Sequence, residues 1–236
     1  MTAPEIATSD RPYILLSCAT SIDGYLDDAS DQRLMLSNEA DLDRVDDVRA
    51  GCDAILVGAG TVRRDNPRLL IRSPRRRQER TARGLTASPL RVTVTSTGNL
   101  DPHSALFTTG DNDRIVYCAN PTIDQTRDRL TGLATVVDGG DPVRPSRVVA
   151  DLARRGVRRI MVEGGAQILT QFLAAGLADE LHVAVAPFFV GDQRAPRFAG
   201  DGCFPWRPGR RATVAEVRQI GDIVLTRYAL SHRCPG

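Results

Sequence analysis

Short apolar runs alternate with polar or helix-like segments along most of the chain. The runs are rich in β-branched residues and end at turn-forming residues, which is the pattern of buried strands. We predict strands at residues 13–19, 54–58, 91–95, 114–118, 135–137, 159–163 and 180–187. Because helix-like segments separate most of these runs, the pattern predicts an α/β protein with a mainly parallel sheet covered on both faces.

The C-terminal part departs from this alternation. Runs at 213–217 and 222–229 are joined directly by a turn at Gln219-Ile220-Gly221, which predicts a β-hairpin. Because a hairpin is antiparallel, we expect the sheet to be mixed at one edge.

Helices are predicted where a capping residue precedes, and a glycine follows, a segment of helical character. They are expected at residues 38–49 with Ser37 as N-cap, at 146–155, at 166–175 and, as a short piece, at 125–130. Gly156 and Gly176 mark two of the helix ends.

The segment 72–89 carries many arginines and almost no apolar side chains. Its arginines are Arg72, Arg75, Arg76, Arg77, Arg80 and Arg83. We predict a mobile loop there. It is either a lid that gathers phosphate groups or a solvated insertion; the second interpretation is favoured, except that Arg72 adjoins an apolar run and could point inward.

Composition narrows the class of protein. The chain has 236 residues, of which 42% are hydrophobic, enough for one sizeable core. We therefore expect one domain at 12–236 after a flexible segment at 1–11. The net charge of +2 predicts no nucleic-acid or membrane partner. Since no apolar run is long enough to span a membrane, we expect a cytoplasmic location.

Residue usage excludes several kinds of chemistry. All 31 basic residues are arginines, so a P-loop lysine and a lysine Schiff base are both impossible. The 5 cysteines form no C-x-x-C pair and only 3 histidines accompany them, so no metal site is expected.

A candidate anion site is Glu163-Gly164-Gly165, between a predicted strand and a predicted helix. The glycines would let a phosphate approach the backbone, and the helix N-terminus would point its N–H groups at it. This suits the pyrophosphate of a dinucleotide, although any tight turn explains two glycines equally well. Glu163 itself either contacts a ligand or caps a neighbouring helix, because a carboxylate that ends a buried strand needs a partner.

Two further polar junctions follow predicted strands. Residues 58–67 offer the hydroxyl of Thr61 and the carboxylate of Asp65 beside small residues, which favours a site over a simple helix turn. The third junction, at 20–24, contains Asp23-Gly24, which any turn can contain.

Together these junctions resemble the reductase domain of the bifunctional riboflavin-biosynthesis deaminase-reductase family, which has a dihydrofolate reductase-like fold. The matching motifs span 12–230 and include Ser21-Ile22-Asp23-Gly24, Thr61-Val62, Asp65-Asn66-Pro67, Val162-Glu163-Gly164-Gly165 and Gly176-Leu177-Ala178-Asp179-Glu180-Leu181. The resemblance implies a three-layer αβα domain with a mainly parallel mixed sheet and a C-terminal β-hairpin.

The resemblance also implies NADPH as hydride donor and a pyrimidine that carries a ribosylamino 5′-phosphate as substrate. The cofactor contacts implied are Thr20, Thr61, Asp65, Ser96, Gly164, Gly165, Ala166, Gln167 and Ile168. The substrate contacts implied are Ser37, Arg49, Asn66, Leu69, Arg72 and Glu163. Glu163 is the first candidate for the catalytic acid and Asp23 is the second; a bound water could also supply the proton.

Three features differ from the family pattern. Ser17 stands where bacterial members generally carry a lysine, which puts the substrate or its pose in question. Asn66 replaces a frequent aspartate, and the chain contains no zinc-deaminase signature, so a separate deaminase is expected to act in the pathway.

Other functions stay open. The fold would also suit reduction of a pterin such as dihydrofolate, reduction of a related tailoring-pathway heterocycle, or a regulatory protein that binds NADPH without catalysis. A homodimer is expected, and its interface is either the apolar segment 181–190 or another surface, since that segment could equally be core.

Overall fold

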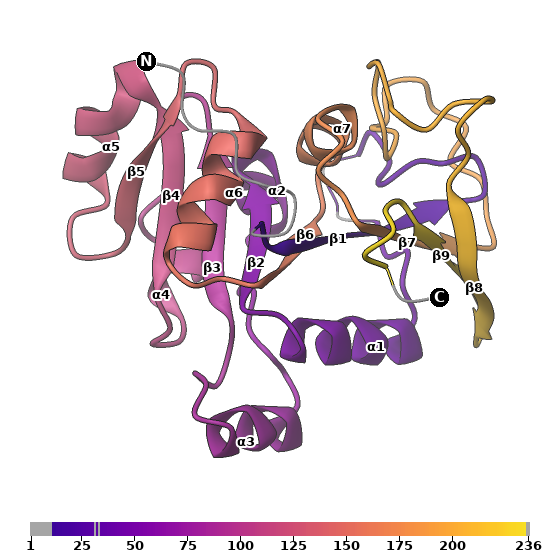
Figure 1. Ribbon diagram of the computed structural model, residues 1–236, viewed down its shortest axis with the longest axis horizontal. Coiled ribbons are helices and arrows are strands. Elements are labelled where there is room, and N and C mark those ends of the chain that lie inside the picture. The colour runs from indigo at the N-terminus through magenta and orange to yellow at the C-terminus, as the bar shows by residue number, and fades with distance from the viewer. Residues whose placement is uncertain (1–10, 31, 33, 235–236) are drawn as a thin grey trace.

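The computed structural model describes residues 11–30, 32 and 34–234. Across these residues one nine-stranded sheet forms the centre of the fold, in the order β5-β4-β3-β2-β6-β1-β7-β9-β8 (Figure 1). The strands are β1 (Tyr13–Ser21), β2 (Ala54–Gly58), β3 (Leu90–Thr95), β4 (Arg114–Ala119), β5 (Thr135–Gly140), β6 (Arg159–Glu163), β7 (Glu180–Ala186), β8 (Thr213–Ile220) and β9 (Ile223–Ala229). Every predicted strand is present, and most are longer than the apolar run that predicted them.

The sheet is parallel from β5 to β7 and antiparallel beyond it. β7 pairs with β9, and β9 with β8, in antiparallel register, so the predicted hairpin and the mixed edge are confirmed. The predicted turn at 219–221 was displaced: Ile220 still pairs with Ile223, and the turn is made by Gly221 and Asp222. Gly221 has a positive φ of 64°, which glycine adopts without strain.

The described residues contain the four predicted helices, with small shifts at their ends, and three further helices that were not predicted. They are α1 (Glu39–Ala50), α2 (Ala59–Asp65), α3 (Pro74–Ala82), α4 (Ala105–Thr108), α5 (Ile123–Arg129), α6 (Pro145–Arg154) and α7 (Ala166–Ala174), with a 3₁₀ turn at Asn120–Thr122. The N-cap of α1 is Asn38 and not Ser37, because the Asn38 side chain accepts a hydrogen bond from the Asp41 amide at 2.8 Å.

The prediction of a mobile loop at 72–89 was wrong, because α3 lies inside it. Ser73 caps this helix and Pro74 occupies its first turn, a start signal that the low apolar content obscured. α3 has no apolar face to bury: its buried side chains are Arg76 and Arg80. Arg76 forms ion pairs with Asp43, Asp46 and Asp47 of α1 at 2.6 to 3.1 Å.

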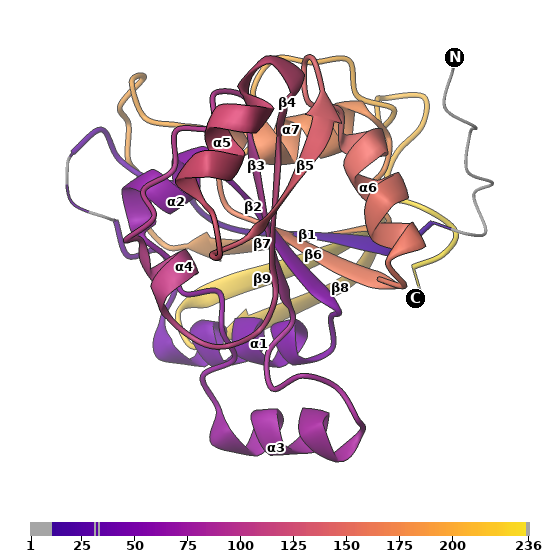
Figure 2. The ribbon, with the colours of Figure 1, turned by 90° about the vertical axis from the view of Figure 1, so that its left-hand side faces the viewer.

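Helices cover both faces of the sheet, as expected for three layers (Figure 2). On one face α6 and α7 pack Leu152, Leu169 and Phe172 against Ile14 and Leu16 of β1. On the other face lie α1, α2 and α4, and α3 extends outward from α1. The sheet therefore has an apolar core on each side, and its carboxyl edge is left to the loops.

Residues 1–10 of the expected flexible segment 1–11 lie outside the described residues. Arg11 is described, and its guanidinium donates two hydrogen bonds to Asp179 at 2.7 Å. No helix in the described part of the chain is long and apolar enough to cross a membrane.

Candidate active site

A large cavity opens at the carboxyl ends of the parallel strands β1, β2, β3 and β6. Its volume is about 1150 Å³, and its wall includes Cys18, Gly58, Ser96 and Glu163 from or just after these strands. Drug-sized ligands occupy pockets of roughly 300–1,000 Å³, so this cavity has room for more than one such ligand.

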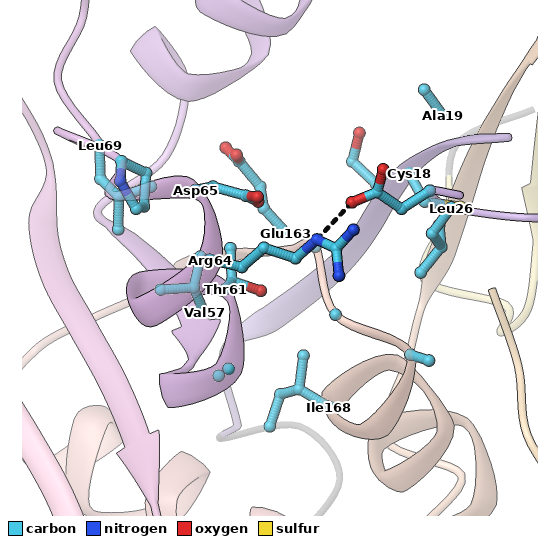
Figure 3. A pocket seen from close by; sticks show the side chains of 18 of the residues that line it. Cys18, Ala19, Leu26, Val57, Thr61, Arg64, Asp65, Leu69, Glu163 and Ile168 are labelled. Carbon is cyan, nitrogen blue, oxygen red and sulfur yellow. Dashed lines mark ion pairs between the residues drawn. The ribbon is translucent and has the colours of Figure 1, made fainter. Parts of the chain in front are cut away.

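The connections from β2 and β6 create the opening. These strands are neighbours, yet α2 packs Val62 with Ile55 on one face, while α7 packs Phe172 with Val162 on the other. Two adjacent strands whose chains leave in opposite directions form a switch point, where open α/β sheets bind ligands. In Figure 3, α2 with Thr61 lies on one side of the cavity and α7 with Ile168 on the other.

The glycine turn before α7 is pressed against α2. Gly164 and Gly165 have positive φ values of 60° and 71°. A Cβ at Gly165 would lie 2.9 Å from Thr61 Oγ1, and one at Gly164 would lie 3.2 Å from Thr61 Cγ2. Only glycine therefore meets the backbone angle and the contact together, and the turn leaves the α7 N–H groups open to an anion. These residues fit the pyrophosphate of a dinucleotide.

Most of the predicted cofactor contacts line this cavity. Those in its wall are Thr61, Asp65, Ser96, Gly164, Gly165, Ala166, Gln167 and Ile168. Thr20 is not in the wall: its side chain is buried within β1, on the strand position between Ala19 and Ser21.

The predicted substrate contacts are also brought together. Ser37, Arg49, Asn66, Leu69, Arg72 and Glu163 all line the cavity. Asn66 and Leu69 have positive φ values of 43° and 52°, a backbone conformation that residues other than glycine rarely adopt. Such conformations cluster at ligand-binding sites. The Asn66 side chain also accepts a hydrogen bond from the Ala105 amide at 2.6 Å, which anchors this bend.

Arg49 and Glu163 form a bidentate ion pair in the cavity wall. Arg49 Nε and Nη2 donate to the two Glu163 oxygens at 2.6 and 2.5 Å. Burial would lower the pKa of Arg49, but the charge of Glu163 and these hydrogen bonds raise it. Because both carboxylate oxygens already accept from a guanidinium, Glu163 is arranged as a carboxylate that orients Arg49. This geometry limits its use as the predicted acid.

Asp23, the second predicted acid, lies outside the cavity wall. Its carboxylate accepts hydrogen bonds from the Ser21 hydroxyl and from the amides of Val190 and Gly191. Desolvation alone would raise the pKa of Asp23, yet these bonds outweigh it and hold that pKa at about 2. Asp23 therefore ties the end of β1 to the loop after β7 and is a poor proton donor at neutral pH.

Arg64 reaches across the cavity from α2. Its Nε lies 2.6 Å from Asp27 Oδ2, an ion pair drawn as the dashed line at Arg64 in Figure 3. Its Nη2 donates to the carbonyl oxygens of Asp28 and Ser30. Sequence analysis did not single out Arg64 or Asp27, because no local pattern marks a contact between a helix and a distant loop.

Cys18 lines the cavity without being reactive. Burial raises the pKa of its thiol to about 12, so the thiolate that attacks electrophiles is absent at neutral pH. Among the described residues no group of three or more His, Cys, Asp or Glu side chains is placed to hold a metal ion.

Comparison with known proteins places these features in a family. A protein of Archaeoglobus fulgidus named 2,5-diamino-6-ribosylamino-4(3H)-pyrimidinone 5′-phosphate reductase is 33% identical over 213 residues, which cover 90% of this chain and 95% of that one. The riboflavin biosynthesis protein RibD of Bacillus amyloliquefaciens is 32% identical over 220 residues; this chain spans 57% of its length.

Solved structures share the fold. A pyrimidine reductase-like protein of Corynebacterium diphtheriae superposes with a TM-score of 0.78 at 22% identity, over 96% of this chain and 95% of that one. A deaminase/reductase of Thermotoga maritima gives 0.76 at 21% identity, over 94% of this chain and 57% of that one. The model of the RibD C-terminal domain matches residues 12–226, and the chain belongs to this family.

Proposed function

We propose that the protein is an NADPH-dependent reductase of riboflavin biosynthesis. Its substrate is 2,5-diamino-6-ribosylamino-4(3H)-pyrimidinone 5′-phosphate or the deaminated 5-amino-6-(5-phosphoribosylamino)uracil, and its product carries an open ribityl chain. The observation that carries this proposal is one cavity with an anion-binding glycine turn beside the Arg49–Glu163 pair and Arg72. The names of the similar proteins support the same substrate class.

The cavity offers separate places for the two reactants. The Gly164-Gly165 turn and Thr61 suit the cofactor pyrophosphate, and Ser96 lies at the end of β3 for its adenosine half. Arg49, Glu163 and Arg72 lie on the α1 side, where a sugar phosphate can use the guanidinium fork. When bound, the cofactor supplies a hydride to the sugar carbon.

The residues of the chain position the sugar and manage one proton. Reduction needs an open-chain imine or an equivalent electrophile at the sugar carbon, and the product nitrogen must hold a proton. Glu163, held by Arg49, accepts a hydrogen bond from the ribosylamino group and fixes the sugar; a bound water then delivers the proton. The Arg72 side chain is exposed, and its distance of 3.9 Å to the Asp46 carboxylate is too long for a hydrogen bond, so its charge is available to the 5′-phosphate.

The homodimer and the cytoplasmic location are also proposals. The segment 181–190 is not a free surface over its strand part, because β7 lies between β1 and β9 and buries Leu181, Ala184 and Ala186. The edge strand β8 and its neighbour β9 instead expose Val214, Val217 and Val224, which suit a second copy. Light scattering on the purified protein measures the mass of the assembly; a monomer would contradict the dimer.

Cofactor oxidation tests the function directly. NADPH oxidation is followed at 340 nm with the pyrimidine phosphate as substrate, beside dihydrofolate as substrate and beside NADH as donor. We expect turnover of the pyrimidine with NADPH and little with dihydrofolate. Turnover of dihydrofolate instead would identify a pterin reductase, and NADPH binding without turnover of the pyrimidine would contradict the proposal.

A further inference from the structure

A row of three polar side chains crosses the sheet beneath α1. Ser17 of β1 pairs in register with Glu163 of β6 on one side and with His182 of β7 on the other. Leu15 and Met161, two positions earlier, pack against α1, so the alternation places Ser17 and Glu163 on the same face. Since neighbouring strands lie about 4.8 Å apart, the row is about 10 Å long.

Two arginines of α1 lie over the ends of this row. Arg49 binds Glu163, and Arg44 Nη1 lies 3.3 Å from His182 Nδ1. Ser17 stands between them and lines the cavity, as do Arg44 and Asp41. The short Ser17 side chain leaves the middle of the row open. The Arg44 guanidinium lies beside His182, one strand away from the position where bacterial family members generally carry a lysine.

Asp41 and Arg44 form a buried pair with unused hydrogen-bonding capacity. Arg44 Nε donates to Asp41 Oδ1 at 2.7 Å, and the two side chains are 9% and 1% exposed. Within the described part of the chain, the other carboxylate oxygen, Asp41 Oδ2, is buried without a hydrogen-bond partner. A guanidinium has five N–H donors, of which the contacts to Asp41 and His182 use two.

We propose that Asp41, Arg44 and Ser17 recognise the heterocyclic ring of the substrate; this inference rests on the function proposed above. A pyrimidinone presents N–H donors beside a carbonyl acceptor, and the pair presents a carboxylate oxygen beside guanidinium N–H groups. A small movement of the wall lets a ring N–H reach Asp41 Oδ2 and supplies the partner that this oxygen lacks.

Charge separates this end of the cavity from the phosphate end. Arg44 is neutralised by Asp41, so the pair suits an uncharged polar ring better than a phosphate. Arg72 and Arg77 also line the cavity but are not neutralised in this way: the carboxylate of Asp46 lies 3.9 Å from Arg72, and Arg77 donates to the carbonyl oxygens of Ile71 and Arg72. Arg49 links the two ends, since its Nη1 lies 3.5 Å from the Leu70 carbonyl oxygen.

The test compares Asp41→Asn and Arg44→Met with two matched surface changes. Glu39→Gln is the control for the loss of a carboxylate on α1, and Arg154→Met, on α6, is the control for the loss of a guanidinium. For each variant the KM for the pyrimidine phosphate is measured, and the Kd for NADPH and for ribose 5-phosphate is measured by calorimetry. Thermal unfolding confirms that each variant is folded, and Arg44→Lys replaces Arg44→Met if the latter is not.

We expect the KM for the pyrimidine to rise at least tenfold in the Asp41 and Arg44 variants. NADPH, whose proposed site is the glycine turn, and ribose 5-phosphate, which has no heterocyclic ring, should bind within twofold of the unaltered protein, and the controls should change nothing. An unchanged KM in folded variants overturns the inference while leaving the proposed function intact, and so does an equal loss of ribose 5-phosphate binding. Absence of pyrimidine turnover in the unaltered protein overturns the proposed function, and the inference with it.

Discussion

Two regions of the sheet, one under α6 and α7 and the other under α1, are built from different kinds of contact. Under α6 and α7 the buried side chains are apolar, with Phe172, Leu169 and Leu152 at the centre. Under α1 the sheet carries buried charged groups, and α1 itself buries Asp41 and Asp46.

The contrast separates stability from function. Burial of apolar area is the main favourable term in folding, and it involves no charge that salt can screen or pH can titrate. Buried ion pairs repay their desolvation only in part, so they add little net stability. Charges retained under α1 therefore point to a use other than holding the fold, and the cavity opens beside them.

The largest effect on stability is expected in the apolar region under α6 and α7. Phe172→Ala removes a fully buried ring from the centre of that cluster, and its loss should cost about 3–5 kcal/mol of unfolding free energy. Chemical denaturation at low and high salt measures it, and the loss should be the same at both. A cost below about 1 kcal/mol would mean that this region does not carry the fold.

The next effect is on turnover and lies in the charged region under α1. Glu163→Gln leaves the buried Arg49 guanidinium without its countercharge and removes the proposed contact with the sugar. We expect kcat/KM for the pyrimidine phosphate to fall at least tenfold, which is about 1.4 kcal/mol of transition-state stabilisation. Glu79→Gln on the exposed face of α3 serves as the control. Full turnover by Glu163→Gln would remove Glu163 from the mechanism.

A third prediction concerns the stability of the fold at low pH. Burial would raise the pKa of Glu180, but hydrogen bonds and charge from His182, with Arg227 and Tyr13, lower it from 4.5 to about 2. A lowered pKa in the folded state means that the stabilisation is present above the unfolded value, about 4.5, and is lost as pH falls toward 2.

The test is the unfolding free energy measured from about pH 6 down to about pH 2, the range in which carboxylates titrate. Glu180→Gln should reduce the slope of stability against pH by about one proton in that window. Phe172→Ala should keep the slope of the unaltered protein. Equal slopes for Glu180→Gln and the unaltered protein would show that Glu180 does not contribute.

The smallest effect is expected at α3. Arg76→Ala removes its ion pairs with Asp43 and Asp47, which are largely exposed, and with the buried Asp46, which keeps hydrogen bonds from the Arg72 and Ser73 amides. We expect a loss below about 1 kcal/mol that shrinks further in 1 M salt. Hydrogen exchange of the α3 amides should increase in the variant. A loss that does not depend on salt would mean that α3 is held by packing.

Patterns local to the chain predicted the fold well. Each strand was found because a buried strand leaves a continuous apolar run, and the hairpin because two such runs lie a few residues apart. The Gly164-Gly165 turn was found because a strand, two glycines and a helix are consecutive in sequence. The helix α3 was missed because its buried side chains are arginines, and a helix docked by charge leaves no apolar periodicity.

Contacts between distant residues set the limit of prediction for the site. The resemblance identified Arg49 and Glu163 separately, but their pairing depends on β6 lying between β2 and β1. The resemblance also placed Thr20 and Asp23 at the site; in the structure Thr20 is buried in β1, and Asp23 anchors the loop after β7.

The sequence alone determined the succession of strands along the chain, four of the helices, the glycine turn and the family resemblance, because each depends on neighbours in the chain. The tertiary structure decided which charges meet: Arg44 beside His182, Arg76 among the aspartates of α1, and Arg64 across the cavity at Asp27. A charged side chain looks the same in sequence whether it is solvated or buried in a pair, since the free energy that separates the two comes from partners that only folding brings near.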